Sequence, residues 1–229
     1  MRFPIPLVEA RLLRRYKRFL ADMEMPDGTQ VTAHCPNPGA MTGLATPGQT
    51  CWLAPAAQTA KLDWGWKLTR TPEGAMAIID TSLANRIVAE ALTTQTLAPL
   101  GHTSFTPEAK LDATSRIDFR LTTLTGPLWL EVKSVTLARG TQALFPDSKT
   151  ARGTKHLHAL TQAVAQGEQA AMLYLISRDD TQTFDIAADI DPTYAAAFQA
   201  AKSAGVAIYT LTTQITPTQI TAQTLTRLA

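Results

Sequence analysis

The chain has 229 residues, 45% of them hydrophobic, and a formal net charge of +2. This length supports a sizeable core, divided as we expect into two modest domains. No run approaches the roughly 18 continuous apolar residues of a membrane helix, no signal-peptide pattern opens the chain, and two cysteines imply no disulfide framework, so we expect a soluble cytoplasmic protein without membrane contact.

The first twenty residues carry a strong positive charge. Six basic residues stand there against Glu9 alone, which gives this segment +5 and leaves −3 for the rest of the chain. The basic residues are interleaved with leucine and aromatic residues, a pattern that favours a strand or helix with one packed face and one face offered to phosphates. A solvated face on a small domain explains the pattern equally well. The residues that we predict to bind nucleic acid here are Arg14, Arg15, Lys17 and Arg18.

Residues 1–80 read as short strands separated by turns. We expect strands at 16–25, 30–34, 50–54, 66–71 and 75–79, with a Pro26-Asp27-Gly28 turn after the first. This pattern is typical of a small all-β barrel. The loop at 35–43 is crowded with proline, asparagine and glycine, so its backbone suits a close approach to a ligand or to the neighbouring domain.

From residue 81 onward the pattern changes to alternating helices and strands. Helices are expected at 82–94, 154–166 and 192–204, and strands at 103–111, 116–122, 128–134, 170–177 and 206–211. The segment 170–177 is continuously apolar, which indicates a strand covered on both faces. The order predicts a mixed α/β domain with flanking helices, followed by a last strand or short arm at 212–226.

Two predicted neighbouring strands carry three charged residues that we expect to meet. Strand alternation places Ile117, Phe119 and Leu121 on one face and Asp118 on the other, and it places Glu131 and Lys133 together on the next strand. If the register sets Asp118 opposite Glu131, the two carboxylates repel each other unless a cation lies between them.

Hard oxygen ligands of this kind suit Mg²⁺ or Mn²⁺, which bind few protein carboxylates and retain water or phosphate oxygens. We predict that Asp118, Glu131 and the Val132 carbonyl hold the ion and that Lys133 balances charge on a phosphodiester substrate. The alternative is an idle ion pair between Glu131 and Lys133 on a solvated strand face.

Six motifs together resemble the sugar fermentation stimulation protein A family. They are YKRFLAD (16–22), HCPNPGAMTG (34–43), SRIDF (115–119), EVKSVTL (131–137), FPD (145–147) and RGTKHL (152–157). The resemblance implies an OB-fold-like domain at 1–80 and a restriction-endonuclease-like domain of the PD-(D/E)xK type at 81–229. It also implies DNA binding with little sequence preference and a link to the regulation of sugar (maltose) utilisation in bacteria.

Position by position, the resemblance assigns Asp118 to the acidic residue of the second core strand and Glu131 with Lys133 to the E-x-K of the third. Glu90 corresponds to an extra acidic residue beside the metal. The proline of the PD signature is absent, because Ile117 stands before Asp118.

A second basic group opens the helix that follows the site, where the helix dipole and unpaired N–H groups favour a phosphate. Its members are Arg152, Lys155 and His156. Surface capping, or a structural role for the histidine, is the alternative.

Two functions of different classes remain. The first is a Mg²⁺-dependent nuclease that cuts DNA in preference to RNA. The second is a non-catalytic DNA-binding regulator of sugar metabolism genes, which keeps a nuclease fold without turnover. The intact set of Asp118, Glu131 and Lys133 favours the enzyme, because a pure binder gains nothing by holding two carboxylates against a polyanion.

Overall fold

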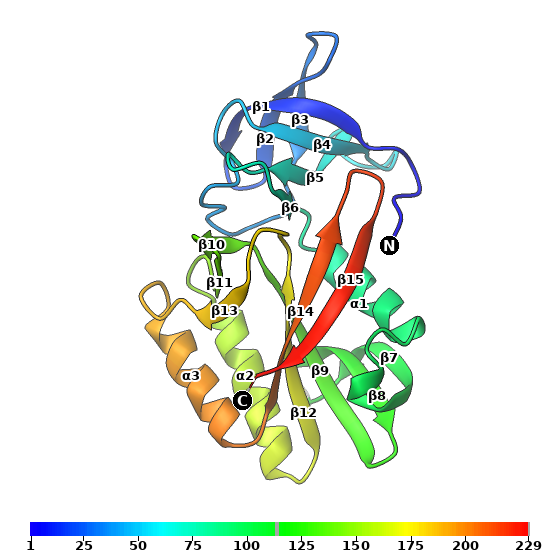
Figure 1. Cartoon of the computed structure of the whole chain (residues 1–229), viewed down its shortest axis with the longest axis vertical. Helices are drawn as coiled ribbons and strands as arrows, with labels where there is room; N and C mark the ends of the chain where they lie inside the picture. Colours follow the sequence, from blue (N-terminus) through cyan, green and yellow to red (C-terminus); the bar gives the residue numbers. More distant parts are fainter. Residues whose placement is uncertain (113–114, 229) are drawn as a thin grey trace.

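The computed structural model describes residues 1–112 and 115–228, and its first part is a small β-barrel at one end of the molecule (Figure 1). The strands lie in the order β3-β2-β1-β4-β5-β6, and an additional parallel pairing of β3 with β5 closes the barrel. The strands are β1 (Val8–Tyr16), β2 (Leu20–Glu24), β3 (Gln30–His34), β4 (Thr50–Pro55), β5 (Trp64–Arg70) and β6 (Met76–Ile78). The predicted N-terminal barrel is confirmed.

The barrel interior is built by side chains that alternate along the strands. Leu12, Met23, Leu53 and Trp66 are fully buried in one cluster with both cysteines. The predicted strand at 16–25 is wrong at its start, because Lys17 and Arg18 adopt positive φ angles of 49° and 64° and form the turn between β1 and β2. The basic segment is therefore a strand that ends in a turn.

The second part is a mixed six-stranded sheet in the order β15-β14-β12-β9-β8-β7. Strand β12 runs parallel to β9 and β14, and the outer pairings are antiparallel. Its strands are β7 (His102–Lys110), β8 (Arg116–Thr123), β9 (Gly126–Val135), β12 (Gln169–Ile176), β14 (Ala207–Ile215) and β15 (Ile220–Arg227). The predicted mixed sheet is confirmed, and the stretch after residue 211 is the end of β14 followed by β15.

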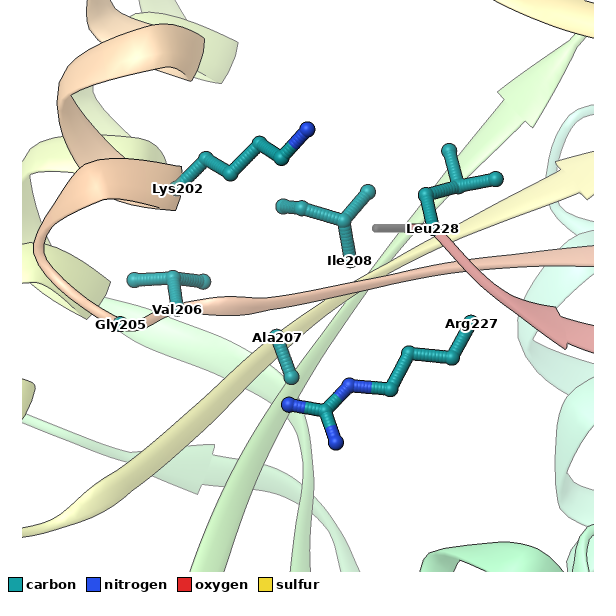
Figure 2. Close-up of a pocket in the computed structure, with 7 residues that line it drawn as sticks. All are labelled: Lys202, Gly205, Val206, Ala207, Ile208, Arg227 and Leu228. Carbon is teal, nitrogen blue, oxygen red and sulfur yellow. The ribbon is translucent and has the colours of Figure 1, made fainter.

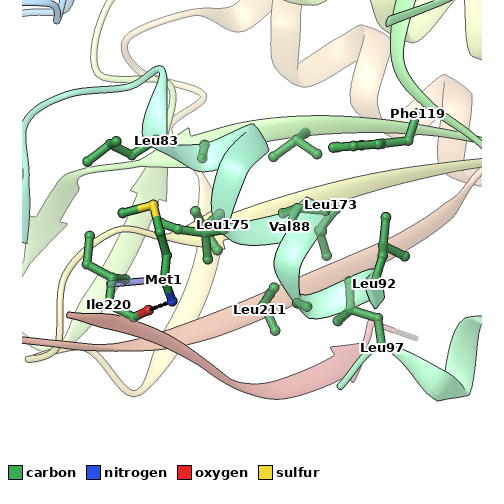
Figure 3. Close-up of a cluster of buried hydrophobic side chains, with 14 of the residues drawn as sticks. Met1, Leu83, Val88, Leu92, Leu97, Phe119, Leu173, Leu175, Leu211 and Ile220 are labelled. Atoms are coloured by element: carbon green, nitrogen blue, oxygen red, sulfur yellow. Dashed lines mark hydrogen bonds between the residues drawn. The ribbon is translucent and has the colours of Figure 1, made fainter. Parts of the chain in front are cut away.

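Helices cover both faces of this sheet. Helix α1 (Leu83–Thr93) packs on one face through Leu83, Val88 and Leu92, as Figure 3 shows. Helices α2 (Ala151–Ala165) and α3 (Pro192–Ser203) cover the other face. Because β12 is buried from both sides, its continuous apolar run is explained.

The segment between the strand expected at 128–134 and the helix expected at 154–166 contains two short strands that the sequence pattern does not predict. Strands β10 (Leu137–Arg139) and β11 (Gln142–Phe145) pair with β13 (Thr183–Ile186) in a separate three-stranded sheet. These strands are three or four residues long, which is too short for a period-2 pattern to identify them.

The first residues of the chain lie on the second part rather than on the barrel. The Met1 ammonium donates to the Ile220 carbonyl at 2.5 Å, which Figure 3 shows, and Phe3 N–H donates to the Thr218 carbonyl at 3.2 Å. The two parts are thus joined at the chain start as well as near residue 80. Within residues 1–112 and 115–228, no helix combines the length and the apolar character that a bilayer crossing requires.

Candidate active site

A cavity of about 830 Å³ lies between the barrel and the second part and is lined by both. The barrel contributes Arg18 and the loop at 37–39, and the second part contributes the start of α1, the ends of β8 and β9, the 145–150 segment and the start of α2. Asp118, Glu131, Val132 and Lys133 all line it. Asp118, Glu131 and Lys133, which we expected to meet, therefore share one cavity.

Asp118 is held by two N–H donors from different elements. The Asn85 side-chain amide of α1 donates to Asp118 Oδ1 at 2.7 Å, and the Val132 backbone N–H donates to Oδ2 at 2.8 Å. The carboxylate thus bridges α1 and β9 and is fixed in position.

The pairing of β8 with β9 ends at Phe119 opposite Leu130, just before this site. Phe119 packs in the α1 cluster, whereas Ile117, two residues earlier, packs in the α2 and α3 cluster. The prediction that these two side chains share one face is wrong. Alternation fails here because β8 is no longer paired with β9 before Phe119. The backbone N–H of Val132 in β9 donates to the Asp118 carboxylate instead of to the backbone of β8. The two strands separate at the point where the cavity opens.

Glu131 is almost fully buried, at 1% exposure, and contacts the side chains of a lysine and a histidine. Lys133 Nζ donates to Glu131 Oε1, and the same oxygen contacts His156 Nδ1 of α2. Arg152 Nε lies 3.5 Å from His156 Nε2 and donates to it. This contact places the proton of a neutral ring on Nδ1, so that His156 donates to Glu131.

The two carboxyl groups have pKa values that move in opposite directions. Burial and then the charge of Glu131 raise the pKa of Asp118, against the N–H donors of Val132 and Asn85. Burial also acts to raise the pKa of Glu131, but the His156 hydrogen bond and the Lys133 charge together bring it below its ordinary value. Asp118 and Glu131 are thus close enough to repel each other. The positive charge of Lys133 stabilises the ionised form of Glu131 more than that of Asp118.

The formal charges around the cavity cancel. Four basic side chains (Arg18, Lys133, Lys149 and Arg152) and four acidic ones (Glu108, Asp118, Glu131 and Asp147) line it. A polyanion entering this cavity therefore gains no net attraction from the protein side chains alone.

The basic residues predicted to bind nucleic acid separate into groups. Arg18, Arg152 and His156 line the cavity. Lys17 and Lys155 are exposed, and neither is among the residues that line it. Arg14 is exposed and paired with Asp22 at 2.8 Å.

Arg15 has a structural environment. Its guanidinium donates to the carbonyls of Arg18, Asn37 and Gly39 at 3.0, 2.9 and 3.0 Å. A side chain engaged by three backbone oxygens fixes the 37–39 loop against the β1–β2 turn. Its interaction with phosphates remains a prediction that this geometry does not favour.

The structure places Glu90 away from Asp118. The Glu90 carboxylate pairs with the Met1 ammonium at 2.5 Å, its side chain is half exposed, and it is not among the residues that line the cavity. The α1 residue that contacts Asp118 is Asn85, five positions earlier. The predicted role of Glu90 beside the metal therefore has no support in the geometry.

Asn85, Asn37 and Asp147 are among the cavity residues that sequence reasoning missed. Asn85 lacks the charge by which a metal ligand is recognised, and Asn37 and Asp147 lie in loops that meet only in the fold. Asp147 Oδ2 accepts the Met41 N–H at 3.2 Å, which joins the FPD motif to the HCPNPGAMTG motif. The shared richness of both motifs in proline was the available signal.

A smaller cavity of about 370 Å³ lies between the end of α3 and the β14–β15 pair (Figure 2). Lys202 and Arg227 line it, but their charged ends extend in different directions, as Figure 2 shows. None of the predicted site residues borders this cavity. Of these two cavities, the larger one is lined by predicted site residues.

Two family models together cover nearly the whole chain. The sugar fermentation stimulation protein RE domain matches residues 82–219, and the SfsA N-terminal OB domain matches residues 13–79. The two matched ranges are separated by residues 80–81.

Individual relatives agree with these matches. Sugar fermentation stimulation protein homologs of Roseobacter denitrificans and Jannaschia sp. are 51% and 50% identical, covering 95% and 96% of this chain and 94% of each relative. A homolog of Geobacter metallireducens is 42% identical with 96% coverage of both chains.

The fold is matched by a solved structure. The structure of Pyrococcus furiosus SfsA in complex with Ca²⁺ superposes with a TM-score of 0.89 at 25% identity, covering 98% of this chain and 96% of that one. With the OB and RE domain models, the close relatives and this superposition in agreement, the chain belongs to the sugar fermentation stimulation protein family.

Proposed function

We propose that the protein is a divalent-metal-dependent nuclease that hydrolyses phosphodiester bonds of DNA, in preference to RNA, in the cavity between its two domains. The observation that carries the proposal is the convergence of Asp118, Glu131 and Lys133 in that cavity. A structural ion pair would require only Glu131 and Lys133. The additional half-buried Asp118, which no cationic side chain among the described residues contacts by a hydrogen bond, is what a metal site explains.

The residues present fit a hard cation. Asp118 is a half-buried carboxylate and Glu131 a buried one, and the charge of Glu131 is close enough to raise the pKa of Asp118, as expected where a cation belongs between them. No group of three His, Cys, Asp or Glu side chains across residues 1–112 and 115–228 is arranged to hold a metal. The proposed donors are therefore the two carboxylates and the Val132 carbonyl, a small set that suits Mg²⁺ or Mn²⁺. The Pyrococcus relative was solved with Ca²⁺, another oxygen-seeking cation.

When bound, such an ion polarises a phosphoryl oxygen and lowers the pKa of a coordinated water. The protein residues have separate tasks. Lys133 places a fixed positive charge where negative charge develops on the phosphorus. His156 orients the Glu131 carboxylate, and Asn85 orients Asp118.

Since the formal charges that line the cavity cancel, we expect both the binding and the cleavage of DNA to depend on the metal ion. Because four basic and four acidic side chains line the cavity, a polyanion is attracted only when added positive charge tips the balance. DNA association in this site is therefore expected to require the divalent ion. We propose in addition that DNA is the partner of this protein and that the protein acts in the cytoplasm.

Cleavage of supercoiled plasmid with Mg²⁺ or Mn²⁺ tests the proposal. We expect metal-dependent cutting by the unaltered protein and loss of at least 100-fold in Asp118→Asn and Lys133→Met, because each removes a charge used in the transition state. Asp189→Asn is the matched control, since Asp189 is 60% exposed, pairs with Arg139 and lies outside the cavity. It should cut as the unaltered protein does.

Two results contradict the proposal. Cutting that persists without a divalent ion or in both variants would place the chemistry elsewhere. Equal DNA binding with no cutting by any of the proteins would identify the non-catalytic regulator of sugar metabolism genes.

A further inference from the structure

The most unusual group in the cavity is the side-chain amide of Asn37, which the barrel domain contributes. Asn37 is 3% exposed, and its Oδ1 accepts the Gly39 N–H at 2.9 Å. Because the oxygen must face this N–H, the amide cannot be turned over, and Nδ2 must face the other way. Among the described residues, Nδ2 is buried and has no hydrogen-bond partner.

An unpaired buried donor is unfavourable, so it is rare without a reason. The loop offers no local remedy, because its backbone is fixed from two sides. Arg15 donates to the Asn37 and Gly39 carbonyls, and Thr81 Oγ1 donates to the Pro36 carbonyl at 2.9 Å. The donor is therefore held rigidly in a place where the protein supplies no acceptor.

The surroundings indicate the class of the missing acceptor. Asn37 borders the same cavity as Asp118, Glu131 and Lys133, and Arg18 from the β1–β2 turn borders it beside the same loop. An N–H donor in a cavity that a guanidinium also lines suits an anionic oxygen without protons. In the proposed substrate, these oxygens are the non-bridging oxygens of the phosphodiester backbone.

We infer that the Asn37 amide binds a backbone phosphate of the nucleic-acid strand in the cavity, with Arg18 beside it, so that the barrel fixes the strand relative to the carboxylates of the other domain. This inference rests on the proposed function, because it requires nucleic acid in the cavity. Asn37 is a binding and positioning residue: the phosphate that it holds is offset from the one that reacts, and its contact is expected in the bound ground state. Its loss should therefore raise KM more than it lowers kcat.

Binding of a fluorescein-labelled DNA oligonucleotide, followed by anisotropy with Ca²⁺ present, tests the inference apart from cleavage. Asn37→Asp keeps the oxygen that accepts the Gly39 N–H but replaces the donor with a repelling charge, and Asn37→Ala removes the donor alone. We expect about 10-fold weaker binding for the alanine variant and a larger loss for the aspartate variant, in line with a hydrogen bond to a charged group. Gln223→Glu makes the same amide-to-carboxylate change on an exposed residue of β15 and should bind as the unaltered protein does.

A second measurement identifies the acceptor. Oligonucleotides that carry a single neutral methylphosphonate at successive positions remove one phosphate charge at a time. At one position the losses from the methylphosphonate and from Asn37→Ala should not add, because both remove the same contact. Thermal denaturation of each variant confirms that it is folded.

The outcomes separate the two proposals. Folded Asn37 variants that bind like the unaltered protein, or losses that add at every position, would overturn the role of Asn37. If the unaltered protein binds with the expected dependence on Asn37 but does not cut plasmid, the inference stands and the nuclease proposal fails. A protein that binds no DNA overturns both.

Discussion

The contact between Gly39 of the barrel and Asp147 of the second domain gives the most quantitative prediction. A Cβ at position 39 would lie 2.1 Å from Asp147 Oδ2 and 2.5 Å from Oδ1. Gly39 does not have a positive φ, so alanine is compatible with its backbone, and the steric conflict is the whole effect. Gly39→Ala therefore tests how tightly the two domains are packed.

The expected loss of stability follows from the movement that the Asp147 carboxylate must make. To reach ordinary contact at 3.4 Å, the carboxylate must shift by about 1.3 Å, which breaks the 3.2 Å bond that it accepts from Met41 N–H. Losing a hydrogen bond to a charged acceptor costs about 1.5–3 kcal/mol. For a chain of this length, that corresponds to a fall in Tm of roughly 3–12 °C.

Differential scanning calorimetry of five proteins, the unaltered one and four variants, measures this effect. Gly65→Ala is the control, because Gly65 also lacks a positive φ and its added Cβ would meet Lys67 Nζ at 3.6 Å, an ordinary contact. We expect Gly65→Ala to leave the Tm unchanged or slightly raised, since alanine restricts the unfolded chain.

Asp147→Ala removes the obstructing carboxylate. In that background Gly39→Ala should cost almost nothing, which gives a coupling as large as the single effect. The reasoning is refuted if Gly39→Ala is as stable as Gly65→Ala, or if it costs the same with and without Asp147.

Three further predictions concern single charged groups. Asp118→Asn should gain Tm relative to the unaltered metal-free protein as the pH rises from the ordinary pKa of aspartate to 8, because burial and Glu131 raise the pKa of Asp118 and its ionisation therefore opposes folding. The bond that the new amide loses to one of the two N–H donors costs the same at every pH, so a relative gain that grew on acidification would contradict this sign. Arg15→Met should cost about 2 kcal/mol through its three lost carbonyl contacts, whereas Arg14→Met should cost clearly less because its pair with Asp22 is exposed; equal costs in urea titration would disprove the distinction. Arg18→Ser should reduce the slope of log affinity for DNA against log salt by about one, with Arg14→Ser as the control, and an unchanged slope would remove Arg18 from the phosphate contacts.

The order of elements was readable from local pattern. The hydrophobic pattern predicted α1, α2 and β12 because each buries a continuous stripe or face whose spacing is visible in the sequence. Proline at its start and glycine after its end predicted α3. Strands β10 and β11 escaped because three or four residues carry no period.

The candidate site was predicted in part. Glu131 and Lys133 lie two apart on one strand, so their proximity is a local property of extended backbone. The approach of Asp118 was expected from regular alternation, but it depends on the end of the β8–β9 ladder, which alternation does not predict. Glu90 was chosen for its charge, whereas the helix presents Asn85 to Asp118.

The sequence by itself determined the two-domain order, the strands that carry the acidic residues and the family, because short-range spacing and motif order are written along the chain. Only the tertiary structure decided that the Asn37 loop meets the Asp147 segment over the carboxylates. That contact joins residues 106 positions apart in sequence. It requires Gly39, which is small enough not to obstruct Asp147, and the same loop holds the Asn37 amide with its donor unpaired. Such features depend on distances between distant segments, which no local pattern records.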